Sequence, residues 1–245
     1  MKILATYNIK GGVGKTATAV NLAHLAAREG ARTLVWDLDP QGAASFYFRI
    51  KPKVKGFQKL LDHKKALDDV VKGTDFEQLD LIPADFAYRN LDLALADYKK
   101  PVRQLLKLLR PLSEEYDFLF LDCAPSISLV SENVFYAADA LLVPMIPTTL
   151  SLRTYDQLVG YLDGSELKHT KVLPFFSMVD RRKRLHREII ENLPETRPGI
   201  LRTDIPYASQ VELMGIHRAP LTAFAPGCPA GLAYVNLWGE IKAGI

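Results

Sequence analysis

The sequence has little cysteine and no long hydrophobic run. Its 245 residues include only two cysteines, Cys123 and Cys228. Such sparse and distant cysteines exclude the disulfide framework of a small secreted protein and favour a reduced, cytoplasmic environment. No apolar stretch approaches the roughly 20 residues that cross a bilayer, and the N-terminal apolar run has neither the basic region nor the cleavage site of a signal peptide. We therefore expect a cytoplasmic protein.

Histidine is also scarce, and neither sign of charge dominates. The five histidines show no metal-ligand spacing. The 31 basic and 28 acidic residues leave a net charge of +3, which permits a polyanionic partner without requiring one. With 48% hydrophobic residues, a chain of this length suits one large α/β domain, so we expect a single domain over residues 1–245.

The first sixteen residues, MKILATYNIKGGVGKT, have the pattern of a phosphate-binding loop. An apolar strand over 2–7, a glycine-rich turn and a helix over 15–29 are the context that such a loop needs. Glycines let successive backbone N–H groups approach an anion, and the helix directs its positive end at the same place. Lys15 would contact the β- and γ-phosphates of a nucleotide, and the Thr16 hydroxyl would bind Mg²⁺.

One departure from the usual GxxxxGK[ST] pattern is informative. Ile9 stands where the first glycine is expected, and Lys10 precedes the paired glycines. The resulting KGGVGKT resembles the deviant Walker A motif of the ParA/MinD family of partitioning and positioning ATPases. The resemblance implies ATP as ligand and an ATP-dependent homodimer in which Lys10 reaches the nucleotide of the other subunit. The alternative is that Lys10 is an ordinary solvated lysine in a strand-to-helix turn. The nucleotide-binding residues implied in this motif are Lys10, Gly11, Gly12, Val13, Gly14, Lys15, Thr16 and Ala17.

Two further motifs place carboxylates at strand ends. The strand over 32–36 runs into DLDPQG, which puts Asp37 and Asp39 at the carboxyl edge of the sheet. In the resembled family the second aspartate follows the loop lysine by the spacing seen here, so Asp39 is the catalytic candidate for hydrolysis and Asp37 has a supporting or metal-side role. Alternatively, both acids cap the next helix. The run FLFLDCAPS resembles a Walker B strand, in which Asp122 holds a Mg²⁺-bound water. The segment 124–129 after it would be the switch that senses the γ-phosphate.

Strands and helices alternate along the whole chain with short connections. This order predicts an α/β fold of the P-loop NTPase type, with a doubly wound, mainly parallel sheet flanked by helices. We expect further strands at 79–83, 118–122, 141–148 and 171–179. Helices are expected at 57–71, 91–98, 102–110, 130–138, 150–162, from Leu185 onward, 208–214 and 232–241.

Basic residues gather at two places. The densest group, Arg181 to Arg187, opens an amphipathic helix whose apolar side is Leu185, Ile189 and Leu193, so Arg184 and Arg187 could meet DNA phosphates. A smaller stripe, Arg103, Lys107 and Arg110, shares one outer face of its helix. Either group could instead be only solvated surface.

The resemblance also implies which residues lie beside the adenine base of ATP and which partners the protein binds. It makes Met178 and Pro206 candidate adenine neighbours. It implies non-specific DNA, and a ParB-like or cargo-adaptor protein that stimulates hydrolysis, as partners. The expected function is therefore a cytoplasmic, nucleoid-associated ATPase that partitions or positions a plasmid, chromosome or protein body. Gln210 and Tyr207 replace frequent arginines of the DNA-binding members, which leaves DNA binding open.

Some relatives are disfavoured by what the sequence lacks. The phosphate-loop strand starts at Met1, so we expect no N-terminal helix-turn-helix extension. The last helix has no cluster of basic residues opposite an apolar face, so we expect no membrane partner. A MinD-like membrane-positioning ATPase, or a metabolic or metallochaperone P-loop enzyme without DNA binding, remain the alternatives.

Overall fold

The computed structural model describes residues 1–52, 60–62, 67–164, 170–197 and 199–245. Its seven strands form one sheet in the order β3-β4-β2-β5-β1-β6-β7. All neighbouring strands are parallel except β3, which pairs antiparallel with β4 at one edge. The chain proceeds from β1 toward one edge and later returns to the other side of β1, which is the topology of a doubly wound sheet. The strands are β1 Lys2–Thr6, β2 Thr33–Asp37, β3 Lys72–Gly73, β4 Leu79–Ile82, β5 Phe118–Asp122, β6 Ala140–Met145 and β7 Lys171–Phe176.

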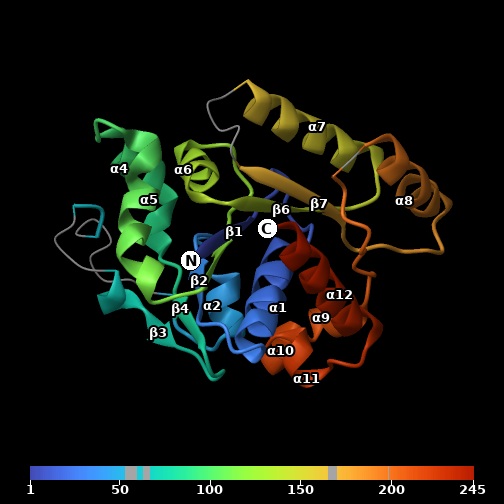
Figure 1. Cartoon of the computed structure of the whole chain (residues 1–245), viewed down its shortest axis with the longest axis horizontal. Coiled ribbons are helices and arrows are strands. Elements are labelled where there is room, and N and C mark those ends of the chain that lie inside the picture. The colour runs from blue at the N-terminus through green and yellow to red at the C-terminus, as the bar shows by residue number, and fades with distance from the viewer. Residues whose placement is uncertain (53–59, 63–66, 165–169, 198) are drawn as a thin grey trace.

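Helices cover both faces of this sheet (Figure 1). One apolar cluster lies between the sheet and α1, α2 and the C-terminal helices, and a second lies between the sheet and α4 to α8. The central strands are therefore buried on both sides, which explains their nearly continuous apolar sequences. The helices are α1 Lys15–Arg28, α2 Ala43–Tyr47, α4 Leu91–Ala96, α5 Gln104–Leu109, α6 Leu129–Ala137, α7 Thr149–Asp163, α8 Arg184–Thr196, α9 Ser209–Glu212, α10 Met214–His217, α11 Leu221–Phe224 and α12 Pro229–Gly244.

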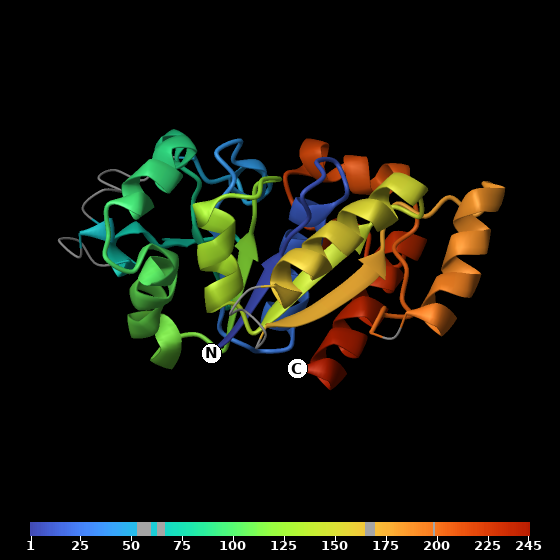
Figure 2. The same cartoon turned by 90° about the horizontal axis from the view of Figure 1, so that it is seen from above.

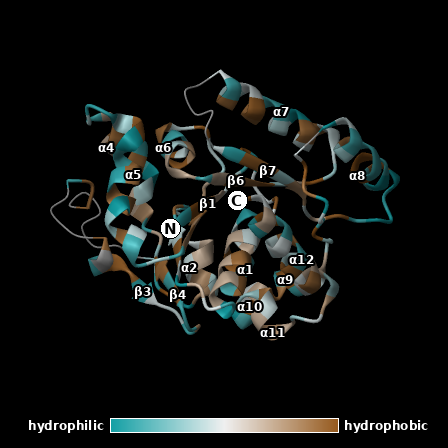
Figure 3. Cartoon of the chain, viewed as in Figure 1, coloured by the Kyte–Doolittle hydropathy of each residue, from teal (hydrophilic) through white to brown (hydrophobic). Residues whose placement is uncertain are grey.

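Hydropathy along the ribbon follows this layering, with apolar residues on the strands and more polar residues on α8 (Figure 3). The central helix α1 is buried along almost its whole length between the sheet and α12. Trp238 of α12 packs edge-on against Phe118 and donates from its indole nitrogen to Glu29 Oε2 at 3.0 Å. In the described part of the chain, no helix is long and apolar enough to cross a membrane.

The expected fold is confirmed, and most expected elements are present with ends shifted by a few residues. Two expectations were wrong in part, and one strand was missed. The helix expected at 208–214 is two short helices, α9 and α10. The helix expected at 102–110 begins with a 3-10 turn, Pro101–Arg103, so its α-helical part is only Gln104–Leu109. The edge strand β3 was not expected at all.

The buried side of α8 also differs from the apolar stripe in its sequence. Ile189 and Leu193 pack against the core as expected, whereas Leu185 is 44% exposed. His186 takes the buried position instead and is 3% exposed. Residues 57–59 and 63–66 of the helix expected at 57–71 lie outside the described residues. Within that range Asp68–Val70 form a single 3-10 turn.

The six parallel strands run from the end of the molecule that carries both termini toward the opposite end, where their carboxyl ends meet (Figure 2). The glycine-rich loop after β1, the loop after β2 and the segment after β5 all start at this carboxyl edge. The fold thus brings together the three motifs that the sequence places far apart.

Candidate nucleotide site

The glycine-rich loop between β1 and α1 has backbone conformations that only glycine adopts readily. Gly12 and Gly14 have φ angles of 69° and 93°. A Cβ atom added at Gly14 would also lie 2.9 Å from Ser177 Oγ, so both conformation and space require glycine there. Gly14 is the residue that precedes the first turn of α1. The loop therefore brings backbone N–H groups together at the positive end of a 14-residue helix.

Lys15 is held inside this loop. Its side chain is buried, and its ammonium donates to the Lys10 carbonyl oxygen at 3.1 Å. Burial lowers the pKa of Lys15, while the nearby Asp122 and Asp39 oppose that shift. The ammonium therefore points into the loop that would surround a phosphate, and the carboxylates across the site favour its charged form.

Asn8 fixes the start of the same loop, a role that the sequence did not reveal. Its side chain is 1% exposed and bridges two segments. Its Oδ1 accepts from the Lys10 N–H at 2.8 Å, and its Nδ2 donates to the Pro144 carbonyl oxygen of β6 at 2.8 Å. The backbone of Lys10 is thereby tied to the sheet, whereas the Lys10 side chain is exposed. An asparagine just before a glycine-rich turn is a common local cap, and this was the available signal.

Asp37 and Asp122 end the neighbouring strands β2 and β5 and are register partners. Both are fully buried. Burial raises the pKa of Asp37 to about 6, with the neighbouring Asp39 adding to the rise and Ser45 opposing it. Burial and the facing Asp37 raise the pKa of Asp122 well above its ordinary range, against the opposing effects of Thr16 and Lys15. Two carboxyl groups are therefore held close together in a dry environment, which disfavours the charged form of both.

This arrangement fits a divalent cation. No group in the described residues hydrogen-bonds to Asp122 Oδ2, although that atom is buried. A buried carboxylate oxygen without a partner is costly, and a hard cation would satisfy it. Thr16 stands at the start of α1 beside this carboxylate. Thr16, Asp37 and Asp122 are thus brought to one place, and carboxylate and hydroxyl oxygens are ligands that suit Mg²⁺.

Asp39 is less enclosed than the other two carboxylates. Its Oδ1 accepts from the Gln41 N–H at 2.9 Å, and its own N–H donates to Asp37 Oδ1 at 3.3 Å. The helix-capping alternative applies to Asp37 rather than to Asp39, because Asp37 Oδ2 accepts from both the N–H and the hydroxyl of Ser45 in α2. The second oxygen of Asp39 has no such role in the described residues, which leaves it available to a water.

A cavity of about 210 Å³ adjoins the loop. Gly12 and Gly14 line it together with Met178 and Pro206, the two residues that sequence reasoning expected beside the base. Met178 has a φ of 56°, a left-handed conformation that is uncommon for a non-glycine residue. Sequence reasoning missed several other lining residues, which no motif marks: Tyr207, Val211, Glu212 and Tyr234.

The segment after β5 is linked to the end of β1. The Tyr7 hydroxyl donates to the Ser126 carbonyl oxygen at 2.7 Å, and the Tyr7 ring packs edge-on against Phe135 of α6. Cys123 is fully buried there, and burial raises the pKa of its thiol. A buried thiol whose pKa is raised in this way is a poor nucleophile.

Known proteins resemble the chain along its whole length. A family model described as an AAA domain matches residues 1–173. The sporulation initiation inhibitor protein Soj of Bacillus subtilis is 30% identical over 252 residues, covering 99% of this chain and 98% of Soj. The chromosome partitioning protein ParA of Myxococcus xanthus is 32% identical over 201 residues, covering 78% of this chain and 70% of ParA. The chain belongs to the ParA/Soj family of partitioning ATPases.

The fold of this ParA/Soj family member also resembles that of a solved structure. Cobyrinic acid a,c-diamide synthase from Mycobacterium smegmatis, with a bound ATP analog and magnesium, matches with a TM-score of 0.83. The match covers 99% of this chain and 94% of the synthase, at 24% identity. At that identity the likeness establishes the shared P-loop fold and leaves the function of this family member to its own site.

The crowded carboxylates predict that Asp122→Asn stabilises the metal-free protein. An aspartate whose pKa is raised on folding favours the folded state at low pH and costs stability as pH rises. The variant should therefore match the parent near pH 4 and exceed it increasingly toward pH 8. We expect a gain of about 1 kcal/mol or more at pH 8, which is a rise in Tm of roughly 2 to 4 °C for a chain of this size.

The measurement is urea unfolding in EDTA from pH 4 to pH 8. Asp163→Asn, which removes an exposed carboxylate at the end of α7, is the matched control and should leave stability unchanged. Lower stability of Asp122→Asn at pH 8 would contradict the prediction. The same variant should bind Mg²⁺ and ATP more weakly than the parent.

Proposed function

We propose that this ParA/Soj family member is an ATP-driven switch that dimerises on ATP, binds non-specific DNA and releases it on hydrolysis. The observation that carries the proposal is the loop from Asn8 to Lys15. It buries one lysine beside the phosphate position, and it presents Lys10 outward on a fixed backbone. A lysine needed only for its own nucleotide would not have to point away from the loop.

ATP occupies the site between the loop and the cavity. Backbone N–H groups from Gly11 to Thr16 and the Lys15 ammonium bind the phosphates, and Met178 and Pro206 flank the base. Thr16, Asp37 and Asp122 would hold Mg²⁺, which would neutralise phosphate charge. Two subunits then meet across their carboxyl edges, and Lys10 of the partner subunit completes each site.

Hydrolysis depends on the orientation of one water molecule. Asp39 lies at the same edge as Lys15, is only partly buried, and has an oxygen that makes no hydrogen bond in the described residues. It positions the attacking water, and a ParB-like or adaptor protein accelerates the step. Loss of the γ-phosphate then changes the segment over 124–129, and the dimer dissociates. Hydrolysis thus times the release of DNA while the partner protein determines which cargo is positioned.

The test measures dimerisation and DNA binding together. Sedimentation velocity and fluorescence anisotropy on a non-specific duplex are run with ATP, with ADP and without nucleotide, across a salt series. We expect dimerisation and DNA binding only with ATP, with an affinity that falls steeply with salt. Lys10→Ala should abolish both while retaining ATP binding. Lys2→Ala, at an exposed lysine where β1 begins, should change neither.

Two outcomes would overturn the proposal. If Lys10→Ala still dimerised with ATP, the proposal would lose its structural basis. An ATP-bound dimer that does not bind DNA would instead favour the alternatives, a membrane-positioning ATPase or an enzyme acting on a small substrate. Vesicle binding and substrate screens would then distinguish these two.

A further inference from the structure

We propose that Tyr7 is a positioning residue for the response to the γ-phosphate, because its hydroxyl holds the segment 124–129 beside the phosphate loop. This inference rests on the proposed function, in which that segment distinguishes ATP from ADP. Tyr7 follows β1 directly, and its side chain is fully buried. It acts through the backbone of Ser126 and not on the nucleotide itself.

The backbone at Tyr7 is tied to the sheet. The Tyr7 N–H donates to the Leu142 carbonyl oxygen of β6 at 3.0 Å. The next residue, Asn8, donates from its side chain to the Pro144 carbonyl oxygen of the same strand. The Tyr7 ring meets the Phe135 ring of α6 edge-on, with the ring centroids 4.7 Å apart. The Tyr7 hydroxyl is therefore held in a fixed position.

This hydroxyl reaches across to the segment that follows β5. It donates to the Ser126 carbonyl oxygen at 2.7 Å, an ordinary length for a bond between two oxygens. Burial raises the pKa of Tyr7, so the hydroxyl stays protonated and remains a donor. The Ser126 N–H stays within the segment and donates to the Ala124 carbonyl oxygen at 3.0 Å. Among the described residues, the Tyr7 hydroxyl makes the one hydrogen bond that joins residues 124–127 to another element.

The segment held in this way lies against the phosphate loop. A Cβ atom added at Gly11 would lie 3.9 Å from Cγ of Pro125, so the proline ring packs beside the loop glycine. Gly11 begins the run of backbone N–H groups that binds phosphates in the proposed function. A shift of Ser126 would move its neighbour Pro125 relative to Gly11. The Tyr7 hydroxyl thereby determines how the segment is placed when a γ-phosphate arrives.

The far end of the segment has support of its own. Ser128 and Ser131 form a capping box at the start of α6, in which the Ser128 N–H donates to Ser131 Oγ at 2.8 Å. The Val130 N–H donates to Asp92 Oδ1 of α4, also at 2.8 Å. These contacts fix the start of α6 but not the residues before Ser128. The placement of residues 124–127 therefore depends on Tyr7.

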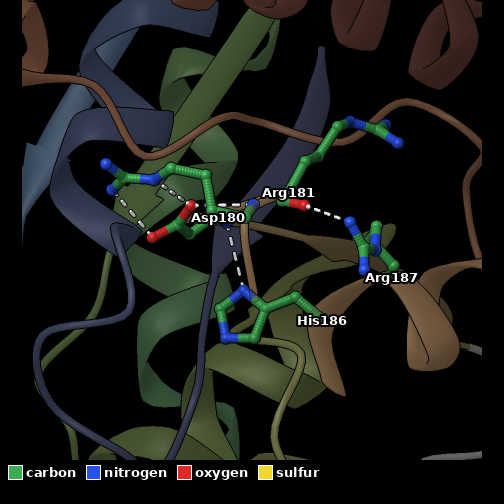
Figure 4. A network of polar contacts seen from close by, with 5 residues as sticks. Asp180, Arg181, His186 and Arg187 are labelled. Atoms are coloured by element: carbon green, nitrogen blue, oxygen red, sulfur yellow. Dashed lines mark hydrogen bonds and ion pairs between the residues drawn. The ribbon is translucent and has the colours of Figure 1, made fainter. Parts of the chain in front are cut away.

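The turn after β7, at the same edge of the sheet, is held differently (Figure 4). The Asp180 N–H donates to Nδ1 of the buried His186 at 3.1 Å, and Arg182 makes two bonds of 2.9 Å to the Asp180 carboxylate. Arg187 donates to the Arg181 carbonyl oxygen at 3.4 Å. Several side chains near that turn share the task of fixing it. The segment after β5 instead depends on one remote hydroxyl, which a single substitution can remove.

Tyr7→Phe removes this hydroxyl and keeps the ring. Calorimetric titrations compare ADP with a non-hydrolysable ATP analogue, both with Mg²⁺, on the parent and on the variant. We expect the Kd for the analogue to rise roughly 5-fold, as for the loss of one hydrogen bond, and the Kd for ADP to stay within about twofold. The two ligands differ because only the analogue carries a γ-phosphate. A purely structural role would weaken both.

Tyr116→Phe is the matched control. The Tyr116 hydroxyl donates to Asp80 Oδ2 at 2.8 Å, just before β5 begins and thus at the end of the sheet opposite the site. This variant should leave both Kd values unchanged. Hydrogen–deuterium exchange without nucleotide adds a local readout. In Tyr7→Phe the amides of residues 124–128 should exchange faster than in the parent, while those of the loop over 8–16 should not change.

The outcomes separate this inference from the proposed function. If the parent dimerises equally well with ADP and with the analogue, the proposed function fails, and this inference fails with it. If only the parent's analogue forms the dimer and Tyr7→Phe binds both ligands as the parent does, the role of Tyr7 alone is overturned. Equal losses of affinity for ADP and for the analogue would also overturn it, because Tyr7 would then support the whole loop.

Discussion

Replacing Lys15 with methionine is expected to lower the affinity for ATP by roughly 100- to 1,000-fold. Methionine keeps most of the length of the side chain but removes the buried cation that faces the phosphate position. Charge-assisted contacts with phosphate are worth about 1.5 to 3 kcal/mol each, and the low polarity of the loop strengthens them. In enzymes, removing one preorganised donor to a developing anion commonly lowers kcat by two to three orders of magnitude, and we expect a loss of similar size in ATP affinity here.

Calorimetric titration with ATP and Mg²⁺ measures this effect directly. Lys72→Met, on the exposed edge strand β3, is the matched control and should bind ATP as the parent does. Thermal unfolding of the variant shows whether the protein still folds without the Lys15 ammonium. Binding within threefold of the parent by a folded Lys15→Met protein would show that the lysine does not face a phosphate.

Asp39→Asn is expected to slow ATP hydrolysis by roughly 100- to 10,000-fold while ATP binding is retained. Proton transfer or water orientation by a positioned carboxylate contributes about this range. Asparagine preserves the oxygen that accepts from the Gln41 N–H, so the local turn should survive. The variant should then accumulate as an ATP-bound dimer that dissociates slowly from DNA.

Single-turnover hydrolysis and the lifetime of the ATP-bound dimer are the two readouts. They should change in opposite directions, since the rate falls and the lifetime rises. Asp163→Asn removes an equally charged but remote carboxylate and should alter neither. If Asp39→Asn instead lost ATP binding in proportion to activity, Asp39 would be a structural residue of the loop.

The strand and glycine patterns were enough to predict the fold and where the site lies. Apolar runs followed by Asp37 and Asp122 could be assigned to the carboxyl edge, because parallel strands end together. The position of Gly14 could be predicted because a left-handed turn leads into α1. These inferences used only local preferences of the chain, namely strand patterns and glycine conformation. Such preferences predict the native structure correctly where tertiary contacts favour the same conformation.

Contacts between remote segments could not be predicted in the same way. Asn8 meets Pro144 only because β1 and β6 are neighbours. The compensation of Arg181 by Asp204 joins residues from different loops, so the sequence overstated the charge available there. His186 replaces Leu185 on the buried side of α8 because its ring accepts a backbone N–H, an interaction that hydropathy patterns do not represent.

The bridge made by Asn8 has a kinetic consequence. Fixing the backbone of one residue costs about 1 to 2 kcal/mol of conformational entropy. In this protein the backbone of Lys10 is already fixed by the Asn8 amide when the chain has folded. In the proposed dimer, two subunits would therefore meet with the Lys10 backbone already ordered. Little of the free-energy barrier to association would then come from ordering this loop. The rate of pairing would then depend mainly on how often two ATP-bound subunits meet.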